Sequence, residues 1–192
     1  MQELKERIEK EGKVLPGNII KVDGFLNHRI DTGLMDRIAE EFGRHFDMDE
    51  VSVILTAEAS GIALSAIVAR HFGKPMIFAK KAKSDNIEGG LYQSDIFSYT
   101  YKKKVTLLVS KEWLAPQDRV LIIDDFMANG EAMRGLCDIV TAAGATLVGI
   151  GCAVEKGFQG GGDRLRAAGY NLKSLAIIES AEPGHIVFRE DG

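Results

Sequence analysis

Short apolar runs alternate with segments of helical periodicity along most of the chain. Runs typical of buried strands cover residues 51–55, 76–79, 119–123, 145–154 and 175–178. Helices are expected between them, over residues 31–46, 62–72, 130–143 and 164–168. Near-continuous apolar strands that alternate with helices are typical of a parallel sheet covered on both faces. The pattern therefore predicts the α/β class, with a mainly parallel, twisted sheet and helices on both of its faces.

The helix over residues 31–46 has the clearest amphipathic pattern. Apolar side chains recur at every fourth position there, and such spacing places them on one face of a helix. They are Leu34, Ile38, Phe42 and Phe46. Asp31 or Thr32 can cap the first turn, because a side-chain oxygen at that position accepts a hydrogen bond from a free backbone N–H.

Residues 85–110 interrupt this alternation. Two stretches with Tyr, Phe, Thr and Val flank the basic segment Lys102–Lys104, which predicts an antiparallel pair of strands inserted between parallel ones. A long insertion at the edge of a sheet is a candidate lid over a ligand. We place this flexible lid at about residues 82–112, and a plain surface hairpin is the alternative.

Composition and charge narrow the class of protein. The chain has 192 residues, 45% of them hydrophobic, with 24 Lys and Arg against 28 Asp and Glu and a net charge of −4. This length fits one domain over residues 1–192. The net charge argues against nucleic acid as a partner, because a broad nucleic-acid interface needs clustered Lys and Arg. Considered for the whole chain, it also argues against an anionic substrate.

The sequence predicts neither a targeting segment nor a membrane span. Residues 1–11 alternate acidic and basic side chains without an apolar core, unlike a signal peptide. The longest weakly polar run, residues 142–154, is shorter than the ~20 residues that cross a bilayer. Cys137 and Cys152 have no partner at metal-ligand spacing. We expect them to be reduced and packed rather than zinc ligands or a disulfide, which favours a cytoplasmic protein.

The segment Val120–Ala132 carries the most informative polar residues. An apolar strand ends there in two adjacent carboxylates, Asp124 and Asp125, and a short loop opens the next helix at Asn129–Gly130. Ligands of open parallel sheets bind beyond the carboxyl ends of the strands, and a helix amino terminus beside a glycine offers free N–H groups to a phosphate. Carboxylates for hydroxyl groups or Mg²⁺, next to donors for a phosphate, match a ribose 5-phosphate.

Other interpretations of these motifs are weaker. Receiver domains also carry paired aspartates after a strand, but after their first strand, whereas this pair lies past the middle of the chain. A dinucleotide fingerprint fails, because Gly149–Ile150–Gly151 lies within a predicted strand and Val154 stands where a third glycine is required. The sequence contains no P-loop motif. A solvated turn that carries two acids is the structural alternative.

The Val120–Ala132 segment resembles the phosphoribosyl-pyrophosphate (PRPP) motif of type I phosphoribosyltransferases. The likeness extends over nearly the whole chain and is closer to the xanthine-specific members than to the adenine, orotate or hypoxanthine-guanine members. It is carried by FLNHRID at residues 25–31, TAEASGI at 56–62 and VEKGFQ at 154–159. The resemblance implies the type I phosphoribosyltransferase fold, with a small hood formed by about residues 1–30 and C-terminal elements.

The same resemblance implies a reaction of purine salvage and its site. The 5-phosphoribosyl group of PRPP passes to N9 of xanthine and gives xanthosine 5′-monophosphate and pyrophosphate, in a homodimer, with Mg²⁺ bound through PRPP rather than by direct protein ligands. Asp124 and Asp125 are the expected catalytic residues and bind the ribose 2′- and 3′-hydroxyl groups. The expected PRPP-binding residues are Ala128, Asn129, Gly130, Glu131, Ala132, Glu58, Ala59, Ser60, Gly61 and Lys81.

Two positions of the phosphate loop depart from the family pattern. Many members carry Thr where this chain has Ala132, and Gly or a basic residue where it has Glu131. Phosphate affinity then depends more on the backbone of the helix terminus. Glu131 repels a phosphate unless its side chain points away from the loop.

The resemblance places the purine base at Ile20, Asn27, Lys156 and Phe158. The ammonium of Lys156 can donate to O6 of a 6-oxo purine, whereas the amino group of adenine would leave donor facing donor. Asn27 carries a donor and an acceptor on one amide and can recognise the edge of a 2-oxo purine. Core packing is the alternative for Ile20 and Phe158.

Two alternatives share the predicted fold. A non-catalytic, PRPP-sensing transcriptional regulator has a similar DDFM segment, which stands here at residues 124–127, but such regulators attach an N-terminal DNA-binding domain for which we expect no room. A phosphoribosyltransferase that prefers guanine or hypoxanthine is the second alternative. A Mg²⁺-dependent phosphohydrolase needs a nucleophile or metal cluster that the sequence does not reveal.

Overall fold

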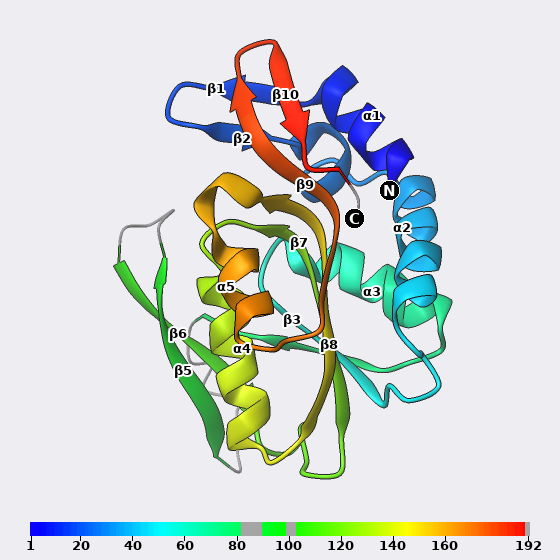
Figure 1. Cartoon of the computed structure of the whole chain (residues 1–192). Coiled ribbons are helices and arrows are strands. Elements are labelled where there is room, and N and C mark those ends of the chain that lie inside the picture. Colours follow the sequence, from blue (N-terminus) through cyan, green and yellow to red (C-terminus); the bar gives the residue numbers. More distant parts are fainter. Residues whose placement is uncertain (82–89, 99–102, 191–192) are drawn as a thin grey trace.

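A six-stranded sheet lies at the centre of the computed structural model, which describes residues 1–81, 90–98 and 103–190 (Figure 1). In the described residues its strands follow the order β10–β9–β8–β7–β3–β4. They are β3 (Val53–Ala57), β4 (Met76–Ala79), β7 (Arg119–Met127), β8 (Thr146–Lys156), β9 (Leu172–Glu182) and β10 (His185–Phe188). Neighbouring strands are parallel except for β9 and β10, which are antiparallel. The predicted, mainly parallel sheet is confirmed.

Helices cover both faces of the sheet, as predicted. The helices α2 (Thr32–His45) and α3 (Gly61–His71) lie on one face, and α4 (Glu131–Ala142) and α5 (Gly161–Ala167) lie on the other (Figure 1). Because side chains of a strand alternate between its faces, β7 contributes to both cores. Leu121 and Ile123 pack in the cluster under α2 and α3, and Val120 and Ile122 pack in the cluster under α4.

The amphipathic helix α2 forms as its sequence predicts. Its four periodic apolar side chains are all buried, namely Leu34, Ile38, Phe42 and Phe46. Asp31, rather than Thr32, caps the helix, because its carboxylate accepts a hydrogen bond from the Leu34 N–H at 3.0 Å. Helix α2 therefore covers one face of the sheet, and α4 covers the other (Figure 1).

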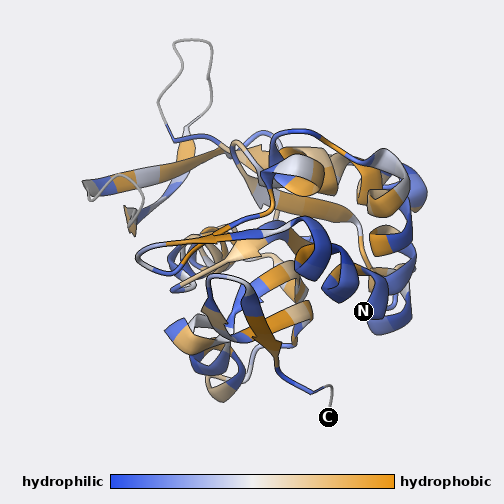
Figure 2. Cartoon of the chain, turned by 90° about the horizontal axis from the view of Figure 1, so that it is seen from above, coloured by the Kyte–Doolittle hydropathy of each residue, from blue (hydrophilic) through white to orange (hydrophobic). Residues whose placement is uncertain are grey.

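A separate group of elements stands over one end of the sheet. It comprises α1 (Gln2–Glu11), β1 (Lys13–Leu15), β2 (Ile19–Lys21), the π-helix η1 (Asp23–Asn27), β10 and the end of β9 (Figure 1). The sequence pattern did not predict α1, because most of its residues are charged or polar, as the colours of Figure 2 show. Two side chains nevertheless attach it to the core, since Leu4 and Ile8 are both fully buried.

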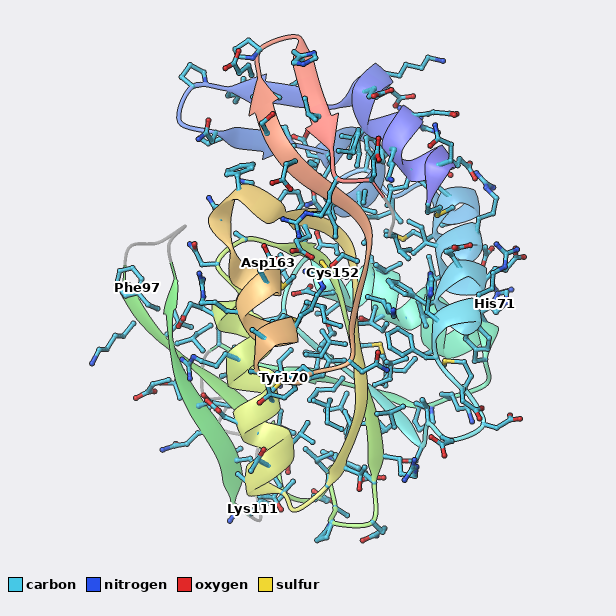
Figure 3. All side chains as sticks on the ribbon, in the orientation of Figure 1. His71, Phe97, Lys111, Cys152, Asp163 and Tyr170 are labelled. Atoms are coloured by element: carbon cyan, nitrogen blue, oxygen red, sulfur yellow. The ribbon has the colours of Figure 1, made fainter. Side chains whose placement is uncertain are left out.

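The predicted antiparallel insertion is present as a hairpin of β5 (Leu91–Ser98) and β6 (Lys103–Ser110). It packs on α4, where a side chain at Gly135 would collide with Ile96 and Leu107. Phe97 lies toward the outer end of the hairpin (Figure 3). Residues 82–89 and 99–102 of the predicted lid lie outside the described residues, so closure over a ligand stays a prediction.

Three predicted elements differ from the observed ones by more than two residues at a boundary. Strand β7 continues to Met127, so the two aspartates lie within the strand and not after it, because β7 keeps its parallel pairing with β8 as far as Met127 and Glu155. The strand predicted over residues 175–178 covers Leu172–Glu182 and is followed by β10. The short helix predicted over residues 164–168 begins at Gly161, directly after the glycine-rich turn.

The two cysteines are packed as predicted. Cys137 and Cys152 are both buried and free, and Cys152 lies in the interior of the sheet layer (Figure 3). Burial raises the pKa of the Cys137 thiol to about 12, which keeps it protonated at neutral pH. In the described parts of the chain, no helix is both long and apolar enough to cross a membrane.

Truncation of Ile8 tests whether α1 belongs to the core. We expect Ile8→Ala to lower the free energy of unfolding by about 2–4 kcal/mol, because it removes a fully buried side chain and leaves a cavity. Glu9→Ala, at the exposed neighbouring position, should change it by less than about 0.5 kcal/mol. Urea titration at neutral pH measures both values. Equal stability of the two variants would show that α1 is not docked in solution.

Candidate active site

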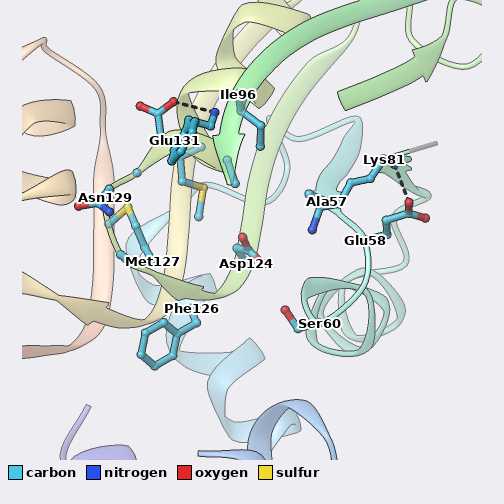
Figure 4. Close-up of a pocket in the computed structure, with 15 residues that line it drawn as sticks. Ala57, Glu58, Ser60, Lys81, Ile96, Asp124, Phe126, Met127, Asn129 and Glu131 are labelled. Carbon is cyan, nitrogen blue, oxygen red and sulfur yellow. Dashed lines mark hydrogen bonds between the residues drawn. The ribbon is translucent and has the colours of Figure 1, made fainter. Parts of the chain in front are cut away.

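A cavity of about 220 Å³ opens at the carboxyl ends of β3 and β7 (Figure 4). It lies where open parallel sheets bind their ligands. It brings together predicted residues from three segments of the chain, namely Glu58, Ser60, Lys81, Asp124, Ala128, Asn129, Gly130, Glu131 and Ala132. Asp125 and the predicted base-binding residues Ile20, Asn27, Lys156 and Phe158 do not line this cavity.

The first loop of the site, Glu58–Gly61, connects β3 to α3. Helix α3 begins after Ser60 without a side-chain cap, which leaves N–H groups of its first turn without a side-chain partner. The Glu58 carboxylate accepts a hydrogen bond from the Lys81 N–H at 2.5 Å (Figure 4), and the Glu58–Ala59 peptide bond is cis. A methyl group at Gly61 would overlap side-chain oxygens of Asp124 and Thr56. The loop therefore packs directly on the first aspartate.

The second loop, Ala128–Ala132, leads from β7 into α4. Gly130 precedes the helix in the left-handed region, with φ 76°, a conformation that glycine adopts without a steric cost. No side chain caps α4 either, in contrast to α2, whose first turn is closed by Asp31. Two helix amino termini with free donors thus face one cavity, an arrangement suited to two anionic groups.

The acidic side chain of the second loop, Glu131, lines the cavity but has a cationic partner. Glu131 pairs with Arg134, with Oε2 3.2 Å from Nη2, and the same oxygen accepts a hydrogen bond from the Phe97 N–H at 3.4 Å. Its charge is therefore offset by a cation and bonded to strand β5. The repulsion that the sequence led us to expect between Glu131 and a phosphate is reduced by this pairing.

Asp124 and Asp125 form a buried carboxylate pair between the two loops. Asp124 is 7% exposed and Asp125 is 1% exposed, and Oδ1 of Asp124 accepts a hydrogen bond from the Asp125 N–H at 3.0 Å. Oδ1 of Asp125 is buried and has no hydrogen-bond partner among the residues that the structure describes. Burial raises the pKa of Asp124 well above its ordinary value, and the adjacent negative charge of Asp125 raises it further. The unpartnered Oδ1 of Asp125 is therefore an available acceptor for a ligand donor.

Asn27 lies against the second aspartate. Its Nδ2 donates a hydrogen bond to Oδ2 of Asp125 at 2.9 Å, across 98 positions of the sequence. Since an ionised carboxylate only accepts hydrogen bonds, this contact orients the amide and leaves its Oδ1 as an available acceptor. The sequence predicted Asn27 at the base but gave no indication of this contact.

Lys156, at the end of β8, connects the sheet to the hairpin of β1 and β2. Its Nζ donates to the backbone carbonyl of Asn18 at 3.0 Å and lies 5.4 Å from the centre of the Phe126 ring. Partial burial lowers its pKa. Phe126 also lines the cavity (Figure 4), so this ring links the cavity to the lysine. Sequence reasoning missed Phe126, although it follows the aspartate pair in the same strand.

The other two predicted base contacts lie in apolar surroundings. Ile20 is 7% exposed within the core cluster, and Phe158 is half-buried against the same cluster. This geometry is what the packing alternative predicts for both residues. Contact of either side chain with a base stays a prediction.

The donor set of the site suits magnesium only together with a ligand. Among the described residues, no three His, Cys, Asp or Glu side chains cluster as a metal site. Mg²⁺ prefers oxygen ligands and is commonly held by one or two carboxylates together with substrate phosphates. Asp124 lines the cavity, so the site fits Mg²⁺ that binds together with a phosphate ligand, as the family resemblance implies.

Comparison with known proteins gives close relatives over the full length. The family model of the phosphoribosyl transferase domain matches residues 26–173. A protein named xanthine phosphoribosyltransferase from Bifidobacterium longum (strain NCC 2705) is 54% identical over 192 residues, which cover 98% of this chain and all of the relative. A protein of the same name from Lachnoclostridium phytofermentans is 53% identical over 193 residues, with all of both chains covered.

A solved structure shares the fold at low identity. The adenine phosphoribosyltransferase of Giardia lamblia, complexed with 9-deazaadenine, superposes with a TM-score of 0.78 at 22% identity, over 93% of this chain and 98% of that chain. At this identity the likeness concerns the arrangement of the backbone alone. It includes the parallel sheet at whose carboxyl ends the cavity lies.

Neutralisation of Asp124 should stabilise the protein. The raised pKa means that the charged carboxylate costs free energy in the folded chain. Below the ordinary value of 3.8 the carboxyl is protonated in both the folded and the unfolded chain, and that cost disappears. We therefore expect Asp124→Asn to melt at a higher temperature than the unmodified chain at pH 7, and the difference to shrink as the pH falls toward 4.

Thermal unfolding followed across this pH range measures the effect. Asp49→Asn, a matched change at an exposed position, should leave the melting temperature nearly unchanged. A lower melting temperature for Asp124→Asn at pH 7 would contradict the unfavourable burial of this charge.

Proposed function

The chain belongs to the phosphoribosyltransferase family and has its type I fold, and we propose that it transfers the 5-phosphoribosyl group of PRPP to N9 of xanthine. The bond from ribose C1′ to pyrophosphate breaks, a bond from C1′ to N9 forms, and the purine loses one proton. The observation that carries the proposal is the buried carboxylate pair between two helix amino termini. The relatives that share about half of its residues and cover its full length supply the substrate class.

The two loops divide the phosphates of PRPP between them. Backbone N–H groups after Ser60 receive the pyrophosphate, and those after Gly130 receive the 5′-phosphate. Lys81 lines the same cavity and adds a cation beside the first loop. An acidic chain can therefore bind a polyanion, because the local field of the site comes from backbone dipoles and one lysine rather than from net charge.

The carboxylate pair acts on the ribose. Asp124 and Asp125 accept hydrogen bonds from the 2′- and 3′-hydroxyl groups, and their negative charge favours the positive charge that develops on the ring as pyrophosphate leaves. Their enclosure in the protein increases this effect, since the charges are shielded little by water. Mg²⁺, bound with PRPP, supplies further neutralisation of the departing phosphates.

Two contacts favour xanthine over other purines. The ammonium of Lys156 donates to O6, a group that adenine lacks. The Oδ1 of Asn27, left free by the bond between Nδ2 and Asp125, accepts from an N–H of the base. Xanthine carries such an N–H at N3, beside the ribose, whereas guanine and hypoxanthine present a lone pair there. This pairing supports the 2,6-dioxo base as the preferred substrate.

The family resemblance adds a hood, a lid, an oligomeric state and a cellular location to the proposal. The elements above the sheet, about residues 1–30 with C-terminal segments, serve as a hood over the base, and residues 82–112 serve as a lid over PRPP. By the same resemblance, the protein is a homodimer and is located in the cytoplasm. Ile20 and Phe158 contribute apolar contacts near the hood, in keeping with their position in the core cluster.

A turnover assay tests the function. The protein is incubated with PRPP, Mg²⁺ and each of xanthine, guanine, hypoxanthine and adenine, and nucleotide formation is followed by chromatography. We expect the highest kcat/KM with xanthine and the lowest with adenine. Guanine or hypoxanthine as the best base would support the alternative specificity, and PRPP binding without turnover would support the regulator.

Removal of the Lys156 ammonium tests base recognition. We expect Lys156→Ala to lower kcat/KM for xanthine about 10- to 100-fold, the effect of a lost hydrogen bond from a charged donor. The KM for PRPP should stay within about twofold, since Lys156 does not line the cavity of the two loops. Steady-state kinetics measure both constants.

Lys173→Ala provides the matched control. Lys173 is an exposed lysine near the start of β9, at the opposite end of the strand from the site, and its removal should leave both constants unchanged. Unaltered xanthine kinetics in Lys156→Ala would exclude this lysine from the base site.

A further inference from the structure

The turn after β8 packs on the loop that precedes α4. Gly161 lies so close to this loop that a methyl group there would overlap the carbonyl oxygen of Ala128. The same methyl would lie 2.6 Å from the carbonyl carbon of Asn129 and 2.6 Å from the nitrogen of Gly130. The face of the Asn129–Gly130 peptide bond is therefore covered by Gly161.

Arg164, on the first turns of α5, holds the edge of the same peptide bond. Its Nη2 donates to the carbonyl oxygen of Asn129 at 3.1 Å, and its Nη1 donates to the carbonyl oxygen of Gln159 at 3.4 Å. The planar guanidinium fixes the angle between these two bonds. One side chain thereby joins the turn that follows Lys156 to the loop before α4.

This contact determines where an N–H group points. In the described residues the only cis peptide bond is Glu58–Ala59, so the Asn129–Gly130 bond is trans, and its C=O and N–H point in opposite directions. Because Arg164 bonds to the Asn129 carbonyl from the side of α5, the Gly130 N–H lies at the opposite edge of the peptide and points away from Arg164. Asn129 and Gly130 line the cavity, so the N–H is available to an anion there.

We propose that Arg164 is a positioning residue, which fixes the Asn129–Gly130 peptide so that its N–H faces the 5′-phosphate. The inference rests on the proposed function and adds to it a residue outside the PRPP motif and outside the cavity lining. Arg164 itself is exposed, and its role is to hold the peptide rather than to contact the ligand. The bond also couples the phosphate loop to the turn beside the base-binding lysine.

Arg166, two residues after Arg164, has different partners and a structural role. Arg166 donates to the fully buried Glu155 at 2.6 and 3.1 Å, so its loss would leave a buried charge unpaired and threaten the fold. Within the described part of the chain, Arg164 pairs with no buried carboxylate and bonds to the carbonyl groups of Gln159 and Asn129. A variant at Arg164 is therefore expected to fold.

Calorimetric binding of two ligand fragments tests the proposal. Ribose 5-phosphate carries the 5′-phosphate, and Mg²⁺-pyrophosphate occupies the loop before α3. In Arg164→Ala we expect the Kd for ribose 5-phosphate to rise about tenfold, the effect of one displaced donor to a charged group. The Kd for pyrophosphate should change by less than twofold, and Lys173→Ala should alter neither value. In turnover, the KM for PRPP should rise more than kcat falls.

A second variant separates geometry from charge. Arg164→Lys keeps the positive charge but cannot bond both carbonyl groups with a fixed angle, so it should lose most of the ribose 5-phosphate affinity that Arg164→Ala loses. Full affinity in Arg164→Lys, or unchanged affinity in Arg164→Ala, would overturn the positioning role. Equal weakening of both ligands would also overturn it, because that result indicates general damage to the fold.

The two proposals fail in distinguishable ways. An unmodified chain that forms nucleotide, together with an unaffected Arg164→Ala variant, contradicts only the role of Arg164. An unmodified chain that binds neither ribose 5-phosphate nor pyrophosphate and forms no nucleotide contradicts the proposed function, and the inference with it.

Discussion

Two carboxylates on consecutive residues, nearly withdrawn from water, impose the main physical constraint on this structure. Adjacent like charges in a buried position raise the pKa of Asp124, and the surrounding residues are those that tolerate such a pair. Gly61 leaves room for one carboxylate, and Asn27 donates to the other. One oxygen of Asp125 keeps no partner. A buried acceptor without a hydrogen-bond partner lowers the stability of the folded chain. Such an acceptor at the carboxyl end of a strand is typical of a ligand-binding site, where function takes precedence over stability.

A protein with a negative net charge can bind an anionic substrate, because each group of the substrate meets only the charges close to it. In the proposed function the carboxylates face the ribose, which carries hydroxyl donors, and the phosphates meet two helix termini that no described side chain caps. Glu131, the first residue of α4, is paired with Arg134. The net charge of −4 is a property of the whole chain, and it does not describe the field inside the cavity.

The sequence predicted the parts of the fold that repeat a regular pattern. Apolar periodicity located α2 and the central strands, and the paired aspartates located the cavity, because these signals depend on residues near one another in the chain. Helix α1 was missed, since only two buried side chains attach it. Arg164 was missed for another reason. Arg164 acts on a backbone carbonyl 35 positions away, and backbone groups leave no trace in the sequence that a motif could reveal.

The division between the central sheet and the elements above it explains how one fold can serve different purines. The phosphate loops and the carboxylates belong to the sheet, whose arrangement is shared with an adenine enzyme at 22% identity. In the proposed function the base, in contrast, is bound by groups at the junction with the elements above the sheet. Asn27 bonds to Asp125, and Lys156 bonds to the carbonyl of Asn18, so the position of these elements is set by the ribose site and by the end of β8. Changes in the elements above the sheet can therefore alter the base that is recognised, while the geometry that cleaves PRPP is preserved.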